Sequence, residues 1–378
     1  MENKKRVGIL TMHRVQNFGS VLQTYALFHR INLLGYSCEI IDYQYPNLYH
    51  KSLGIQKSPK SFLCRLLQRG LFYLLYRNTI QKSRFNAFVK KYLIFSKYYE
   101  TKDEIFNNPP KYDIYLTGSD QVWNPVCMKG DPVFFFAFAD QEACKISYAS
   151  SFAISKIPIQ YHGVYKKYLS DYCRVSVRED SGAEIIKALT GLDSKVVCDP
   201  TLLLTKRDYE LIGEGSQLQV KGEYILVYAL TYAYNPYPQI DKVVQKVKRQ
   251  LGLPVIYLQS NSIEHYHLGR SVTSAGPCEF ISLLMNARFV VTSSFHGTAF
   301  ALNFGVPFYA ITPARTVSDS RIMSLLKIVG LEDRGISVEE QLPRTFNIEI
   351  DFHIPHAKLK HYRDSSLNFL RESLKEVR

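Results

Sequence analysis

The sequence predicts an α/β protein made of two Rossmann-like domains that face each other across a cleft. Short apolar runs alternate with helical patterns along most of the 378 residues, as in chains of β-α-β units. The alternation restarts after Leu204, and a chain of this length corresponds to about two domains. We therefore expect an N-terminal domain over 1–205, a C-terminal domain over 206–345, and a charged helix over 346–378 that packs back across both.

The N-terminal domain opens with a complete β-α-β unit. Arg6–Met12 is a short apolar run, and a helical pattern from Leu22 to Leu34 follows it. Gly35 ends this pattern, as glycine often ends helices, and Cys38–Tyr43 is the next strand. The apolar run over 133–139 has the length of a buried strand. Further strands are expected at Tyr112–Gly118, Lys145–Ala149, Arg174–Arg178 and Lys195–Cys198, with a helix over Ser181–Leu189 between the last two.

The C-terminal domain repeats the same alternation. Its apolar runs are rich in Val, Ile and Tyr, which favour strands, and they are separated by segments with helical spacing. The expected strands are Tyr224–Leu230, Pro254–Leu258, Phe289–Ser293 and Pro307–Ile311, and the expected helices are Ile240–Leu251, Cys278–Asn286 and Thr298–Asn303.

Composition favours an intracellular protein with an anionic partner. Lys and Arg number 47 against 34 Asp and Glu, a formal net charge of +13, and such a balance attracts anions. The seven Cys form no C-x-x-C pair, so we expect neither a disulfide framework nor a Cys-based zinc site, and no metal at all. No run approaches 18 apolar residues, so no membrane-spanning helix is expected and the predicted location is the cytoplasm.

Residues 51–99 hold 11 of the basic residues and no Asp or Glu. Apolar and basic residues interleave there, which suits two surface helices with solvated cations. The same pattern suits a basic amphipathic patch that binds anionic lipid at the inner face of the cell membrane. Nucleic acid is disfavoured, because no recognition motif accompanies the charge.

Two candidate ligand loops follow strands of the N-terminal domain, at the edge of the sheet where ligands bind in α/β proteins. The first is 17–20, where Gly19 allows close approach of the backbone and the helix start offers N–H groups to an anion; an ordinary turn is the alternative. The second is 117–124, where Asp120 and Gln121 can bond sugar hydroxyls. The only Trp of the chain, Trp123, can stack on a sugar ring there.

Two more loops carry cationic or anion-binding residues. Arg178 ends a strand and can grip a carboxylate or phosphate with two hydrogen bonds, or form a salt bridge with Glu179, Asp180 or Asp199. The segment 291–298 ends a strand in hydroxyl residues and then opens a helix, which makes an anion cradle. Its candidate residues are Ser293, Ser294, His296, Gly297 and Thr298.

Together these loops resemble the polysaccharide pyruvyl transferase family. The matching segments occur in the family's order, and residues 51–99 and the tail after about 345 do not contribute. They are NFGSVLQTYAL at 17–27, YDIYLTGSDQVWNP at 112–125, SVRED at 176–180, VCDPTLLL at 197–204, SSFHGTAFALNFGVPF at 293–308 and SRIMSLLKIVGL at 320–331.

The resemblance implies a fold similar to the GT-B glycosyltransferases, with the active site between the domains. It implies phosphoenolpyruvate as donor, no cofactor, and a sugar of a surface polysaccharide as acceptor, often galactose and sometimes still on a lipid carrier. The product would be a cyclic pyruvate ketal. By this analogy Arg178 and His296 match donor-binding and catalytic positions, and Asp120 lies in the cleft motif of the first domain, beside Asn17, Gln121 and Trp123 on the acceptor side.

The sequence departs from the family at one position. Several members carry an Arg two residues before the motif His, and here that residue is Ser294. A second donor-binding cation must come from elsewhere, with Arg321 as first candidate and Arg315 as second. Two other functions remain open: a glycosyltransferase that uses a nucleotide sugar, and a relative that binds anions or membranes without catalysis.

Overall fold

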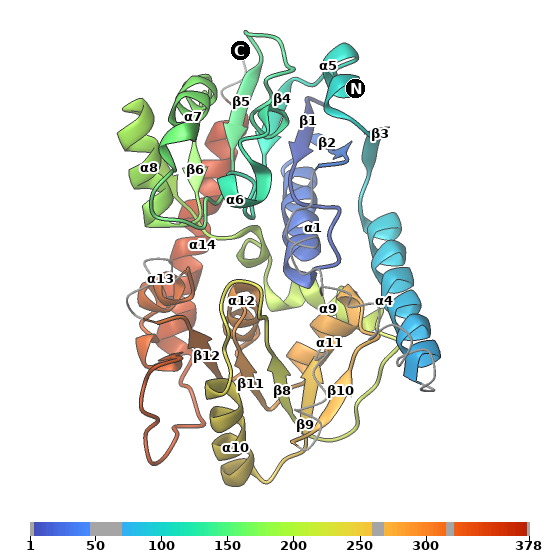
Figure 1. The fold of residues 1–378 in the computed structure, drawn as a ribbon, viewed down its shortest axis with the longest axis vertical. Helices are drawn as coiled ribbons and strands as arrows, with labels where there is room; N and C mark the ends of the chain where they lie inside the picture. The colour runs from blue at the N-terminus through green and yellow to red at the C-terminus, as the bar shows by residue number, and fades with distance from the viewer. Residues whose placement is uncertain (1–3, 46–69, 259–267, 315–320, 376–378) are drawn as a thin grey trace, which may run out of the picture.

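The structure, a computed structural model, describes residues 4–45, 70–258, 268–314 and 321–375. Two lobes lie one above the other, each built on its own sheet (Figure 1). Within the described residues no helix is both long and apolar enough to cross a bilayer.

The first lobe holds a five-stranded parallel sheet in the order β3-β2-β1-β4-β5. Single β-bridges join the end of this sheet to a small sheet of β6 and β7. The strands are β1 (Arg6–Leu10), β2 (Ser37–Tyr43), β3 (Phe95–Tyr99), β4 (Ile114–Thr117), β5 (Cys144–Ser147), β6 (Ser176–Val177) and β7 (Lys195–Val196). The helices are α1 (Phe18–Leu33), α4 (Gly70–Tyr92), α5 (Lys102–Asn107), α6 (Pro125–Met128), α7 (His162–Leu169) and α8 (Asp180–Thr190).

The second lobe holds a six-stranded parallel sheet in the order β10-β9-β8-β11-β12-β13. Its strands are β8 (Ile225–Tyr228), β9 (Val255–Leu258), β10 (Arg270–Val272), β11 (Phe289–Thr292), β12 (Phe308–Thr312) and β13 (Gly335–Ser337). Its helices are α9 (Lys206–Glu214), α10 (Gln239–Leu251), α11 (Pro277–Met285), α12 (Phe295–Phe304) and α13 (Arg321–Val329), and α14 (His353–Lys375) ends the described chain.

Both sheets follow the strand order of a Rossmann fold, so the predicted fold class is confirmed. In each sheet the first strand lies in the middle, and the order reverses between β1 and β4 in one lobe and between β8 and β11 in the other. Ligands of open α/β sheets bind outside the carboxyl ends of the strands at this reversal. The structure therefore offers two such positions, one per lobe.

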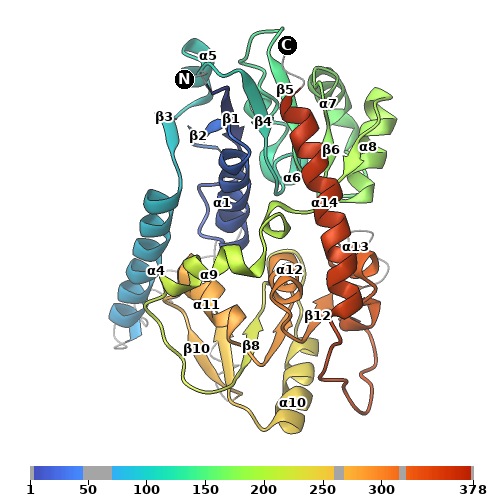
Figure 2. The ribbon, with the colours of Figure 1, turned by 180° about the vertical axis from the view of Figure 1, so that it is seen from behind.

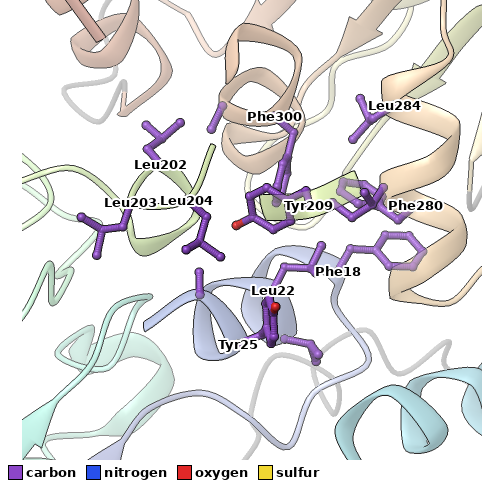
Figure 3. Packing of buried hydrophobic residues seen from close by; sticks show 14 of the residues in the cluster. Phe18, Leu22, Tyr25, Leu202, Leu203, Leu204, Tyr209, Phe280, Leu284 and Phe300 are labelled. Atoms are coloured by element: carbon purple, nitrogen blue, oxygen red, sulfur yellow. The ribbon is translucent and has the colours of Figure 1, made fainter. Parts of the chain in front are cut away.

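One continuous hydrophobic core joins the lobes (Figure 3). Phe18, at the start of α1, is fully buried and stacks on Phe280 of α11 at 4.6 Å between ring centroids and on Phe85 of α4 at 5.2 Å. Tyr209 of α9 packs edge-on against Phe300 of α12. The start of α1 thus packs directly against the second lobe.

Helix α14 runs along the back of the molecule beside both lobes (Figure 2). Its Ser366 Oγ accepts a hydrogen bond from Cys198 N at 2.9 Å, and Arg363 donates to Leu202 O at 2.5 Å. The Arg363 guanidinium also donates to Asn303 of α12. Helix α14 therefore holds both ends of the segment 198–202 in place.

The expected strand over 133–139 is wrong. Residues Pro132–Phe135 form a 3₁₀ turn, because Pro132 starts it and the Asp131 side chain accepts a hydrogen bond from Val133 N at 3.0 Å. Phe136 then adopts a left-handed backbone with φ 53°. The three consecutive Phe rings are buried, so the apolar run reflects packing of a compact turn.

Part of the basic segment 51–99 is packed against the second lobe, and residues 51–69 lie outside the described part. Phe85 and Phe88 of α4 are buried in the shared core. Arg84 donates to Ser274 O at 2.9 Å and lies 3.4 Å from a Glu279 oxygen, so this cation is structural. Lys82, Lys90 and Lys91 are exposed, and binding to lipid stays a prediction.

Replacing Phe18 by Ala should lower the free energy of unfolding by about 3–5 kcal/mol, since a fully buried ring between two lobes leaves a cavity. Denaturant titration measures the change. Leu211→Ala, at a side chain that is 72% exposed, is the control with little expected effect. Two separate unfolding transitions in the unmodified protein would contradict a shared core.

Candidate functional site

A cavity of about 330 Å³ lies where the two strand reversals face each other. Loops at the carboxyl ends of β1, β4, β8 and β11 supply most of its wall, and the segments after β5 and β12 and the start of α13 supply the rest. The polar and aromatic lining residues are Asn17, Ser20, Asp120, Gln121, Asn124, Tyr232, Tyr234, Ser293, Ser294, Phe295, His296 and Arg321.

The first turns of α1 and α12 meet at this cavity. Asn17 caps α1 by accepting a hydrogen bond from Ser20 N, and Ser294 caps α12 by accepting one from Gly297 N. Gly19 is required between them, since a Cβ atom there would lie 2.0 Å from His296 Nδ1. The His296 ring of the second lobe therefore packs directly against the backbone of Gly19 in the first lobe.

A buried carboxylate, Asp199, joins the two predicted cationic residues. Its Oδ2 accepts a hydrogen bond from Arg178 Nη1 at 2.9 Å and lies 3.6 Å from His296 Nε2. Thr201 donates to Oδ1 from both its backbone and its hydroxyl, which fixes the carboxylate at the start of a short 3₁₀ turn. Of the partners considered for Arg178 in the sequence, the structure selects Asp199 for the direct hydrogen bond.

The charge of Asp199 is stabilised by its neighbours. Burial alone would raise the pKa of this carboxyl group, but the charges of His296 and Arg178 and the bond from Thr201 outweigh burial and hold the pKa below its usual range. Asp199 is therefore ionised at neutral pH. The carboxylate oriented toward His296 Nε2 favours the form of the ring that carries a proton on this nitrogen.

Asp120 connects the cavity to this buried network. Its backbone is left-handed, with φ 71°, which is rare for a residue other than glycine and tolerated best by Asn and Asp. Its Oδ2 accepts a hydrogen bond from Ser20 Oγ at 2.5 Å, and its Oδ1 lies 3.8 Å from Arg178 Nη2. The unusual backbone thus places one carboxylate between α1 and the Arg178 guanidinium.

Arg178 itself lies behind the main cavity. Its side chain is 2% exposed, and its guanidinium lies 4.9 Å from the centre of the Phe295 ring. Its Nε and Nη2 atoms have no hydrogen-bond partner within the described residues. Arg178, Phe295 and Arg321 together line an adjoining cavity of about 20 Å³, enough for one water-sized group.

The structure brings most of the predicted site residues to one place. Asn17, Asp120 and Gln121 from the first lobe face Ser293, Ser294, His296 and Arg321 from the second. Arg315 lies outside the described residues.

The hydroxyl cradle expected at 293–298 is largely occupied by the backbone. Ser293 Oγ donates to Leu230 O and accepts from Leu230 N, and Thr298 Oγ1 donates to Ser294 O. Gly297 and Thr298 are buried behind the wall, where a Cβ atom on Gly297 would lie 2.4 Å from Thr292 Oγ1. Their contribution is to shape the helix start rather than to touch a ligand.

Trp123 does not line the cavity, which corrects the expectation of a direct sugar contact. The indole is fully buried, stacks parallel to Phe135 at 6.0 Å and meets Tyr172 edge-on. Its Nε1 donates to Phe134 O. The ring is part of the core that supports the 117–124 loop, because the compact turn at 132–135 folds over it.

Two features of the site escaped the sequence reasoning. Tyr232 and Tyr234 follow β8 and form an aromatic wall, and Tyr234 donates to Ile311 O at 2.6 Å. Burial raises the pKa of Tyr232 although the nearby Arg321 lowers it, so the phenol is neutral at pH 7. The position of these tyrosines just after a strand was the one feature of the sequence that could have predicted their place in the site.

The central role of Asp199 had no comparable feature in the sequence beyond its place in the VCDPTLLL segment.

Replacing Asp199 by Asn should lower the free energy of unfolding at pH 7 by about 3–5 kcal/mol, because the buried Arg178 loses its hydrogen-bonded counter-charge. The folded-state pKa of Asp199 is lowered, so its stabilisation is present above the unfolded pKa of about 3.9 and is lost as pH falls below it. The difference in the free energy of unfolding between the unmodified protein and Asp199→Asn should therefore shrink in denaturant titrations below about pH 4. Asp193→Asn, at a carboxylate that is 93% exposed, should show no such difference; an equal loss there would contradict the assignment.

Replacing Gly19 by Ala should displace the His296 ring and cost about 1–3 kcal/mol of stability, because the new methyl group overlaps the imidazole. The measurement is the imidazole NMR signal of His296 together with denaturant unfolding. Gly163→Ala, where a Cβ atom meets nothing within 4 Å, is the matched control. An unmoved imidazole signal in Gly19→Ala would show that the contact is not rigid.

Several solved structures align with nearly the whole of this chain. UDP-GlcNAc 2-epimerase from Methanocaldococcus jannaschii aligns over 97% of this chain and 93% of its own, with TM-score 0.49 and 10% identity. UGT89C1 from Arabidopsis thaliana, complexed with quercetin, aligns over 100% and 96%, with TM-score 0.44 and 12% identity. ADP-heptose lps heptosyltransferase II from E. coli aligns over 96% and 98%, with TM-score 0.40 and 9% identity. Likenesses this distant carry no inference about ligands or reaction.

The sequence itself is more informative. No curated protein matches the chain. A model of the family described as polysaccharide pyruvyl transferase matches residues 17–315 and so covers the loops after β1, β4, β8 and β11. Because this span is most of the 378 residues, the chain belongs to the polysaccharide pyruvyl transferase family.

Proposed function

We propose that the protein transfers pyruvate from phosphoenolpyruvate to a sugar of a surface polysaccharide, or of its lipid-linked precursor, and forms a cyclic ketal. Galactose is the acceptor sugar that we propose to test first. One observation carries the proposal: a single cavity presents His296 and Arg321 from one lobe and Asp120 from the other. A cation, a proton carrier and a carboxylate thus face the same small space.

Phosphoenolpyruvate carries a carboxylate and a phosphate on three carbons, and the second lobe offers matching groups. Arg321 lines the main cavity, and the first residues of α12, Phe295 and His296, lie in its wall, where the positive end of a helix favours an anion. The small adjoining cavity combines Arg321 and Arg178 with the carboxyl groups of Glu179, Asp180 and Asp199, so the main cavity is where we place the donor anion. In this proposal Arg321 supplies the cation that is absent at Ser294.

The acceptor would bind from the first lobe. Asn17, Gln121 and Asp120 supply amide and carboxylate groups for sugar hydroxyls. Tyr232 lies in the cavity wall with 37% of its side chain exposed, so it offers the aromatic face that was first assigned to Trp123. Ser20 donates a hydrogen bond to Asp120 Oδ2 and so fixes the position of this carboxylate in the wall.

The reaction needs one proton on carbon and one on the leaving group. His296 would give a ring proton to the methylene carbon of the donor, which leaves a cationic centre at the middle carbon. One sugar hydroxyl attacks this centre and passes its proton to Asp120. Phosphate then leaves with the proton held by Asp120, and a second hydroxyl of the same sugar closes the ring and returns its proton to His296, so both groups regain their starting states.

The proposal is tested by incubating the protein with phosphoenolpyruvate and a panel of galactosides and other sugars. The expected result is phosphate release coupled to a mass gain of pyruvate minus water on the acceptor. Nucleotide sugars serve as the comparison, because the alternative glycosyltransferase would be stabilised against heat by them instead. Protection by a nucleotide sugar without donor turnover would overturn the proposal.

Replacing His296 by Gln should lower turnover by about 10²–10⁴-fold, because a positioned proton donor is lost, while circular dichroism of the variant still shows the folded protein. Initial rates of phosphate release measure the effect. His361→Gln, at an exposed position on α14, is the matched control. A His296 variant with near-normal turnover would remove this residue from the chemistry.

A further inference from the structure

A second cavity of about 330 Å³ lies on the other side of the first turn of α1. We call it the anion cavity. Its wall comes from the loop after β1, the end of β2, helix α4 and the start of β3. The lining residues are His13, Arg14, Val15, Gln16, Val21, Asp42, Lys82, Phe85, Asn86, Val89 and Phe95.

The one carboxylate among these described lining residues is fully neutralised. Arg14 donates to both oxygens of Asp42 at 2.7 Å, from Nε and from Nη2. His13 Nε2 lies 2.9 Å from Asp42 Oδ1. Burial raises the pKa of Asp42, but the hydrogen bonds from His13 and Arg14 lower it by more. The net pKa lies below its usual value, so the carboxyl group stays ionised and paired.

Among the described lining residues, the cations outnumber the one carboxylate. His13 Nδ1 lies 2.9 Å from Thr11 O and its Nε2 faces the Asp42 carboxylate, so protein atoms engage both ring nitrogens. Arg14 is paired with Asp42, and Lys82 adds a second cation to the wall, a surplus of positive charge that attracts an anion.

The two cavities share the same structural element. Asn17 and Ser20 face the candidate active site, and Gln16 and Val21, their neighbours in the chain, face the anion cavity. The two cavities therefore lie on opposite sides of the first turn of α1. The amides of Gln16 and Asn86 and the ring of Phe95 suit a further sugar unit.

We propose that the anion cavity binds the phosphate-bearing part of the acceptor, a sugar phosphate or sugar diphosphate linked to the sugar that receives pyruvate. This proposal rests on the proposed function and adds a substrate class to it. The positive wall recognises the phosphate, and because Arg321 and His296 line the candidate active site and not the anion cavity, this phosphate has groups of its own, separate from those that hold the donor. Free inorganic phosphate offers the same chemistry, and the experiment separates the two sources.

The test begins with calorimetric titration of inorganic diphosphate into the full chain, with phosphoenolpyruvate present at saturation. We expect binding to persist and to weaken about tenfold in Lys82→Ala, as for the loss of one charged hydrogen bond. Lys90→Ala, an exposed cation on the same helix outside the cavity, is the matched control and should change affinity less than twofold. Equal losses in both variants, or complete displacement by phosphoenolpyruvate, would overturn the site.

The second arm compares an acceptor sugar linked to a diphosphate with the same sugar as a methyl glycoside. Lys82→Ala should raise the KM for the diphosphate-linked acceptor about tenfold relative to the KM for the methyl glycoside. A variant that loses diphosphate binding without changing this ratio would overturn the acceptor assignment in favour of a free phosphate ligand. Failure of the unmodified protein to use phosphoenolpyruvate with any acceptor would refute the proposed function, while the diphosphate titration still decides the site.

Discussion

The contact between Gly19 and His296 is the constraint on which the site depends. It sets two helix starts from different lobes against each other at van der Waals distance, and a single methyl group would not fit between them. Phe18, one residue away, is clamped by Phe85 and Phe280 of the shared core. Loops at the strand reversals of two separate sheets are therefore assembled into one cavity by packing.

Charge is organised around the same contact. Asp199 holds Arg178 and His296, and Asp120 lies within 3.8 Å of the same guanidinium, so cations and carboxylates alternate through the buried layer. Groups fixed in this way need little rearrangement when charge develops on a bound molecule, which is the physical basis of electrostatic preorganisation. Two further cations line the cavities themselves: Arg321, which is half-buried, in the candidate active site, and Lys82, which is exposed, in the anion cavity.

The sequence was sufficient to predict the architecture, because hydrophobic periodicity and glycine ends of helices are local properties. Parallel sheets then bring the loops that follow β1, β4 and β11 to common edges, which is why Asn17, Asp120 and His296 could be placed together. Trp123 could not be placed, because whether an aromatic ring faces a cavity or the core depends on a distant turn folding over it. The role of Asp199 was equally hidden, since three carboxylates were plausible partners for Arg178 and only tertiary packing selects among them.

The attachment of α14 has a consequence for how the centre comes into being during synthesis. The segment that carries Asp199 is held at Cys198 by Ser366 and at Leu202 by Arg363, and both partners follow every strand of the two sheets in the chain. Domains of a nascent chain fold in order as they leave the ribosome. Both sheets can thus form before α14 is available. Asp199, the counter-ion of Arg178, therefore receives its final support only when this helix docks.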